Sequence, residues 1–116
     1  MIRIEKALTQ PVPSDIYTIG APEDVLFFDI ETTGLSARSA GLYLIGMLTY
    51  TDKKWTLLQF FCEDVADEPA VLQAFFELLH TKKTLISYNG DGFDIPFLRH
   101  MLEQYGLPVS YTHLTL

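Results

Sequence analysis

The sequence predicts a mixed α/β fold, with helices packed against a sheet that contains antiparallel and parallel strands. Short apolar runs rich in β-branched and aromatic residues alternate with two segments of helical period. One of these helical segments separates two strands, and a strand that returns after a crossover helix lies parallel in the sheet. The 116 residues, of which 48% are apolar and 20% charged, are enough for one compact domain and too few for two.

Three strands are expected after an irregular beginning. Residues 1–24 show no sustained period and are predicted to be an irregular lead-in, so that the domain extends from residue 25 to residue 116. Val25–Ile30 is a short apolar run typical of a central strand covered on both faces. Leu42–Tyr50 and Trp55–Phe61 are two further β-rich runs, and the polar residues 51–54 between them predict a hairpin.

Two helices and a fourth strand are expected next. Glu68 and Pro69 are typical of a helix start. After this helix, Thr84–Tyr88 is predicted as a strand and residues 89–93 as a loop. Asp94 is a candidate N-cap for the second helix, which Gly106 and Pro108 should end. The helices have apolar faces made of Leu72, Phe75, Phe76 and Leu79 in the first and Leu98, Met101, Leu102 and Tyr105 in the second.

Two carboxylates, Asp29 and Glu31, stand at the end of the first predicted strand. Side chains alternate along a strand, so residues two positions apart point to the same face. A carboxylate in an apolar strand loses hydration worth several kcal/mol unless a cation or a hydrogen-bond donor replaces the water. The alternative is that the strand ends at Ile30 and that both acids are solvated turn residues. The hydroxyls of Thr32 and Thr33, which follow at once, favour a binding site.

A second acidic motif, YNGDGFDIPFL, covers residues 88–98. A strand ends there, Asn89 and two glycines turn the chain, and Asp94 stands where a helix begins. Turn chemistry and an ordinary N-cap explain the motif when it is taken alone. Together with the first motif, it allows Asp29, Glu31 and Asp94 to meet at one edge of the sheet and to bind hard divalent cations through oxygen.

These two motifs carry a resemblance to a known family. FDIETTGL, residues 28–35, resembles the first motif of the DEDD exonucleases in the RNase H-like superfamily, and YNGDGFDIPFL resembles the second. The sequence is similar to the proofreading exonuclease domains of family B DNA polymerases and to small bacterial predicted exonucleases of the YprB type. The likeness extends from Val25 to about Pro108, and it implies an RNase H-like mixed sheet with flanking helices.

The resemblance also implies a chemistry, the hydrolysis of phosphodiester bonds with two divalent cations. Two Mg²⁺ or Mn²⁺ ions about 3.5–4 Å apart can clamp the attacking and leaving oxygens of an in-line displacement. The implied activity is 3′–5′ digestion of single-stranded ends of DNA or RNA. The implied catalytic and metal-binding residues are Asp29, Glu31 and Asp94, with Asp29 bridging both ions. Those implied to contact the strand end are Thr32, Thr33, Gly34, Leu35, Asn89 and Phe93, although core packing is an equal alternative for Phe93.

The sequence departs from the family at the third motif. That motif, a Tyr or His followed by Asp about four residues later, should supply the fourth carboxylate and the residue that orients the water. No acidic residue follows Glu103. We therefore expect a chain that is truncated at the C-terminus, with a further segment in the parent protein. Groups that orient or activate a water contribute about 100- to 10,000-fold in rate, so weak or no activity is expected from these residues alone.

Charge and cysteine content limit the partners. The formal charge of −7 counts moderately against a nucleic-acid partner, although two bound divalent cations would bring it to −3. Cys62 is the only cysteine, and no apolar stretch approaches the ~20 residues that a membrane-spanning helix requires. A cytoplasmic protein without membrane contact is expected.

Two alternatives to the nuclease remain. DIETT is close to the nucleophile motif of haloacid dehalogenase-type phosphatases, but Glu31 replaces the second Asp of that motif and Asp94 falls one residue early. The other alternative is an RNase H-like module that binds nucleic acid or protein without cutting. The missing third motif favours this module, and the presence of all three acids disfavours it.

Overall fold

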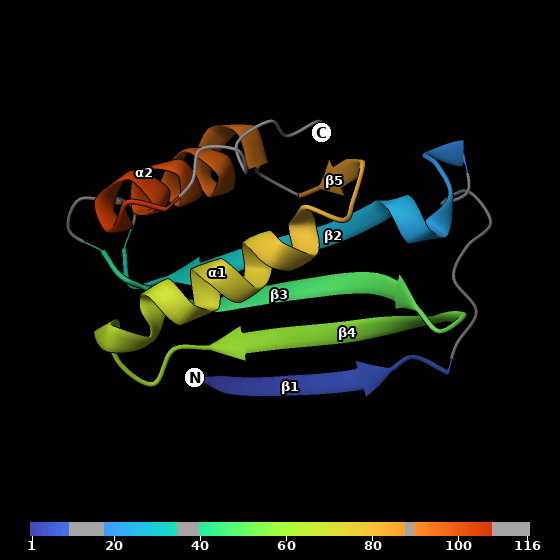
Figure 1. Cartoon of the computed structure of the whole chain (residues 1–116), viewed down its shortest axis with the longest axis horizontal. Coiled ribbons are helices and arrows are strands. Elements are labelled where there is room, and N and C mark those ends of the chain that lie inside the picture. Colours follow the sequence, from blue (N-terminus) through green and yellow to red (C-terminus); the bar gives the residue numbers. More distant parts are fainter. Residues whose placement is uncertain (10–17, 35–39, 88–89, 108–116) are drawn as a thin grey trace.

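A computed structural model describes residues 1–9, 18–34, 40–87 and 90–107 and shows a five-stranded mixed sheet with two helices on one face (Figure 1). The helices are α1 (Glu68–Leu79) and α2 (Ile95–Tyr105). The sheet order is β1-β4-β3-β2-β5, in which only β2 and β5 pair in parallel. The predicted mixed α/β class is confirmed. The strands are β1 (Ile2–Ala7), β2 (Val25–Thr32), β3 (Leu42–Thr51), β4 (Lys54–Phe61) and β5 (Thr84–Ile86).

Strand β1 corrects the expectation of an irregular lead-in. Residues 2–7 pair antiparallel with β4, from Ile2 opposite Phe61 to Ala7 opposite Thr56. The prediction was wrong here because β1 is an edge strand whose residues are all exposed, with Ile2 and Ile4 still 45% and 44% accessible. Ile2 and Ile4 are the only large apolar residues of this strand, and two are too few to establish a period. The position at which the domain begins stays a prediction.

The predicted hairpin between β3 and β4 is present. Asp52 and Lys53 form its two-residue turn with positive φ values of 52° and 65°, between Thr51 and Lys54, which face each other. Two-residue turns of this handedness match the right-handed twist of the strands they join. The turn therefore sets the register in which β3 and β4 pair.

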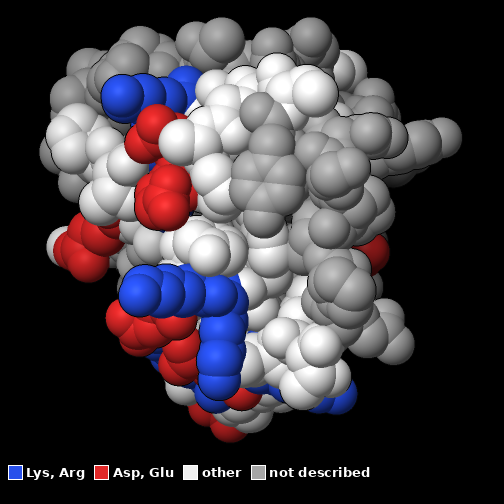
Figure 2. Space-filling view, turned by 90° about the vertical axis from the view of Figure 1, so that its right-hand side faces the viewer, with Lys and Arg blue, Asp and Glu red and all other residues white. Residues whose placement is uncertain are grey.

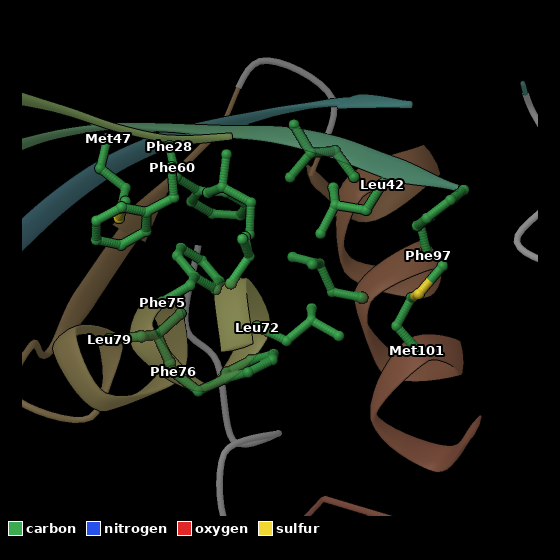
Figure 3. Packing of buried hydrophobic residues seen from close by; sticks show 14 of the residues in the cluster. Phe28, Leu42, Met47, Phe60, Leu72, Phe75, Phe76, Leu79, Phe97 and Met101 are labelled. Atoms are coloured by element: carbon green, nitrogen blue, oxygen red, sulfur yellow. The ribbon is translucent and has the colours of Figure 1, made fainter. Parts of the chain in front are cut away.

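The hydrophobic core lies between the sheet and the two helices. Figure 3 shows Phe28 and Met47 from the sheet pointing toward Phe75 and Phe76 of α1, while Phe97 and Met101 of α2 approach Leu42. The rings of Phe28 and Phe75 are 5.4 Å apart between centroids. Every apolar residue predicted for the two helix stripes is buried except Tyr105, which is half-buried. We call this side of the sheet the covered face.

The opposite side of the sheet is covered by neither described helix, and we call it the open face. By strand alternation it carries Phe27, Asp29 and Glu31 of β2. The strand was expected to be covered on both faces, but among the described residues Asp29 and Glu31 on this face are exposed. A shallow groove of about 350 Å³ lies on the open face. Its lining includes Phe27, Asp29, Gly46, Leu48, Leu57 and Ile86.

Neither described helix is long and apolar enough to cross a membrane.

Candidate acidic site at the end of the central strand

Asp29 and Glu31 point to the open face from within β2. Both are exposed, whereas Phe28 and Ile30, which alternate with them, are buried on the covered face. Strand β2 continues to Thr32, so the alternative in which it ends at Ile30 is wrong. Asp29 lies opposite Gly46 of β3. Gly46 has no side chain, and a Cβ atom built on it would lie 4.0 Å from the Asp29 carbonyl oxygen.

Asp94 lies at the start of α2 and is almost completely buried, with 3% of its surface accessible. Its side chain makes no capping hydrogen bond to α2, which corrects its interpretation as an ordinary N-cap. Instead, Oδ2 accepts a hydrogen bond of 2.8 Å from the Ser87 hydroxyl. The Ile30 backbone, beyond the residues 25–27 that pair with β5, is near enough to lower the Asp94 pKa.

The surroundings of Asp94 raise its pKa above the ordinary value for an aspartic acid. Burial is the largest cause, and the negative charges of Asp29 and Glu31 add to it. The hydrogen bond from Ser87 and the backbone of Ile30 act in the opposite direction. The structure thus brings the three predicted acids within electrostatic reach of one another. A cation placed among them would relieve this repulsion.

The residues after β2 form a hydrogen-bonded turn. The Thr32 hydroxyl donates to the Gly34 carbonyl at 2.6 Å. Thr33 pairs with Gly41 twice, because its N–H donates to the Gly41 carbonyl at 2.8 Å and its hydroxyl accepts from the Gly41 N–H at 2.7 Å. Thr32, Thr33 and Gly34 therefore have a defined shape next to Glu31. Leu35 lies outside the described residues.

Asn89 and Phe93 are the other two residues that were predicted to contact the strand end. Asn89 lies outside the described residues, and Gly90–Asp94 form a π-helical turn instead of the expected loop. Phe93 is half-buried against the core, with its ring centroid 5.4 Å from that of Phe97. This contact supports core packing for Phe93. Its predicted role at a strand end stays a prediction.

The acids fit a divalent cation by their chemistry. Asp29, Glu31 and Asp94 supply the carboxylate oxygens that Mg²⁺ and Mn²⁺ prefer. Within the described ranges, however, no group of three or more His, Cys, Asp or Glu side chains is arranged to hold a metal ion. The three acids therefore influence one another electrostatically, but their described positions do not form a complete set of metal ligands.

Sequence analysis missed the role of Ser87. Its hydroxyl is the donor that holds the Asp94 carboxyl, seven residues away. A serine directly after a short predicted strand is a weak signal, because turns commonly contain serine. Only the return of the chain through the π-helical turn brings the two residues together.

Basic side chains alternate with acids at the opposite end of the sheet. Figure 2 views the molecule from the end that carries the β3–β4 turn and shows Lys and Arg interleaved with Asp and Glu. The Lys83 ammonium lies 3.7 Å from the Asp24 carboxylate, and the Lys82 ammonium donates to the Glu23 carbonyl at 2.8 Å. The residues that the structure describes at this end therefore present no uniform positive surface to a phosphate backbone.

The fold and the acids together define an α/β protein with a carboxylate site at the edge of its sheet. Such sites are typical of the carboxyl ends of strands, where side chains from several elements meet. The family model of the RNase H superfamily matches residues 26–116. The chain belongs to this superfamily, and its mixed five-stranded sheet is an RNase H-like fold of the nuclease type.

DNA polymerases are among its relatives. The chain is 30% identical over 92 residues to a DNA polymerase of Desulfurococcus sp. (strain Tok) and 29% identical over 92 residues to one of Pyrococcus glycovorans. Each alignment covers 72% of this chain and 12% of the polymerase. The chain thus spans about an eighth of the length of these two relatives.

A solved structure supports the fold. The family B DNA polymerase from the hyperthermophilic archaeon Pyrobaculum calidifontis superimposes with a TM-score of 0.63 at 23% sequence identity, over 78% of this chain and 12% of the polymerase. The similarity to family B DNA polymerases that the two motifs predicted is confirmed.

Proposed function

We propose that this chain is the acidic part of a metal-dependent 3′–5′ exonuclease that hydrolyses phosphodiester bonds at single-stranded ends of DNA or RNA. The observation that carries the proposal is the state of Asp94, a buried carboxyl whose pKa is raised in part by the charges of Asp29 and Glu31. Repelling acids that are kept close together are typical of functional sites. The DNA polymerase relatives favour a nucleic-acid substrate.

Each acid has a distinct part in the proposal. Asp29 and Glu31 offer oxygens from the open face, and Asp94 offers its carboxyl from the sheet edge, where Ser87 orients it. Two divalent cations, Mg²⁺ or Mn²⁺, would supply the charge that activates a water and stabilises the leaving oxygen. The turn at Thr32–Gly34 borders Glu31 and is the proposed contact for the terminal nucleotide.

A non-catalytic binding module is the second candidate. It is favoured by the open arrangement of the three carboxylates, which do not form a metal-holding group among the described residues. The phosphatase alternative loses its support because the chain belongs to the RNase H superfamily. A purified chain that binds single-stranded oligonucleotides in EDTA and never cuts them, even when a C-terminal extension is present, would favour the module.

The proposal is tested by melting the purified chain against MnCl₂ concentration. Ligand at 100 times its dissociation constant should raise the free energy of unfolding by about 2.7 kcal/mol. Asp29→Asn removes one charge at nearly constant shape and should abolish most of this rise. The matched control is Asp52→Asn in the exposed β3–β4 turn, where asparagine tolerates the positive φ.

The proposal requires that the rise saturates, persists in Asp52→Asn and is lost in Asp29→Asn. An equal rise in all three proteins would place the ion elsewhere, and no rise in any of them would contradict a metal site in this chain. The direction is tested with an oligonucleotide labelled at its 5′ end, which 3′–5′ digestion shortens to a ladder. Release of the labelled nucleotide first would contradict the proposed direction.

A further inference from the structure

Glu68 is a buried carboxylate that joins three elements of the covered face. It is the first residue of α1 and is 3% accessible. Its Oε2 accepts a hydrogen bond of 2.8 Å from the N–H of Leu42, where β3 begins. Its Oε1 accepts one of 2.5 Å from the hydroxyl of Tyr105, the last residue of α2. One side chain thus ties the start of α1 to the start of β3 and the end of α2.

Further hydrogen bonds connect this group of residues to the turn beside the acidic site. Leu42 follows Gly41, which pairs with Thr33 through two hydrogen bonds of 2.8 and 2.7 Å. Gly41 lies between Glu68 and Thr33, since a Cβ atom built on it would be 3.5 Å from Glu68 Oε2 and 3.8 Å from Thr33 Oγ1. Thr33 is two residues from Glu31. Contacts therefore run without interruption from Tyr105 to the end of β2.

A carboxylate is a costly group in this position. Removing it from water costs several kcal/mol unless donors replace the hydration, and here the donors are one N–H and one hydroxyl. Glu68 also gains from the positive end of the α1 dipole. Burial raises the pKa of Tyr105 to about 12, with the Glu68 hydrogen bond and charge adding to this shift. The hydroxyl accordingly remains a donor at neutral pH.

We propose that Glu68 and Tyr105 are positioning residues, which hold the Thr33–Gly41 pairing and thereby determine how tightly the turn binds a single-stranded end. This inference rests on the proposed function, because the turn is the proposed nucleotide contact. Without the Tyr105 hydroxyl, Glu68 keeps one donor and must turn toward water. That movement weakens its bond to Leu42 and loosens the paired residues.

The test uses Tyr105→Phe, which removes one hydroxyl and keeps the ring. Two properties are measured, amide hydrogen exchange at Leu42 and Gly41 and the affinity for a short 5′-fluorescein oligothymidylate in MnCl₂. Loss of a hydrogen bond of ordinary net strength should raise exchange and weaken binding, each on the order of 5- to 10-fold. Protection at the Phe75 amide shows that the core of the variant is folded.

Two controls separate positioning from general destabilisation. Tyr43→Phe makes the same chemical change on an exposed residue next to Leu42, and Leu78→Ala loosens α1 near the end opposite Glu68. Neither should change the affinity. Unchanged exchange at Leu42 and Gly41 in Tyr105→Phe would overturn the inference, as would faster exchange with unchanged affinity. If the wild-type chain does not bind the oligothymidylate, that result contradicts the proposed function, and the inference is contradicted too because it depends on that function.

Discussion

The two faces of the sheet differ in what completes them. On the covered face, Phe28 and Ile30 pack into a core that α1 and α2 close. On the open face, Phe27 of the same strand is only partly buried, and neither described helix lies over it. Asp29 and Glu31 belong to the open face. A strand can carry core residues and functional carboxylates at alternate positions because its side chains point to opposite faces.

The difference shows where a charged site is tolerated. A carboxylate under the helices would need donors for its oxygens, as Glu68 has from Leu42 and Tyr105. On the open face water supplies them, so Asp29 and Glu31 need no protein partner. Asp94 combines features of both faces. It is buried like Glu68, and its pKa responds to the charges of the exposed Asp29 and Glu31. Three variants test this comparison.

The largest effect is expected from Phe75→Ala on the covered face. Phe75 is fully buried and its ring packs against Phe28 and Phe76. The truncation should lower the free energy of unfolding by about 3–5 kcal/mol, since it removes apolar contacts and leaves a cavity. Urea denaturation followed by Trp55 fluorescence measures this loss. A loss below about 1.5 kcal/mol would contradict the description of this face as the core.

A smaller effect is expected from Leu57→Ala on the open face. Leu57 is half-buried and lines the groove there. The side chain gives up less apolar burial than Phe75, so the loss should be about 1 kcal/mol. The same urea experiment measures it. A loss as large as that of Phe75→Ala would mean that the open face is closed by further structure in solution.

The smallest effect is expected from Asp29→Asn on the open face, and it is measured at the buried Asp94. Removal of this charge should lower the pKa of Asp94 toward its ordinary value, because the Asp29 charge is one of the causes that raise it. Carboxyl-carbon NMR shifts recorded against pH measure the change, and Asp52→Asn is the control. An unchanged Asp94 pKa would show that the two acids are not electrostatically coupled.

The same coupling has a defined sign in stability. A raised pKa means that folded Asp94 holds a proton at pH values where the unfolded chain has lost it. The contribution of Asp94 to the free energy of unfolding is complete below the ordinary pKa of 3.8, which holds in the unfolded chain. It is lost as the pH rises from 3.8 through the raised pKa of the folded protein. Asp29→Asn should bring the folded and unfolded pKa values of Asp94 closer together. The melting temperature of the variant should therefore fall over a smaller range of pH than that of the wild type, which a series of melting curves would measure.

Sequence reasoning succeeded where the information is local. The strand that holds Asp29 and Glu31, the β3–β4 hairpin and the apolar stripe of α1 each follow from the period of a short segment, and the structure contains all three. Reasoning failed at β1, whose exposed residues have too little contrast to form a pattern. It also failed for the capping role of Asp94, because a residue at a helix start is interpreted as a cap unless its distant partners are known.

The order of the elements from β2 onward, the shared direction of Asp29 and Glu31 and the superfamily follow from the sequence, because each depends on the period or the motif of a short segment. The face that the helices leave open, the hydrogen bond from Ser87 to Asp94 and the contacts of Glu68 with Leu42 and Tyr105 depend on the tertiary structure. These contacts link residues from 7 to 37 positions apart. No local period encodes such pairs, since burial and hydrogen bonding across elements are settled only when the whole chain packs.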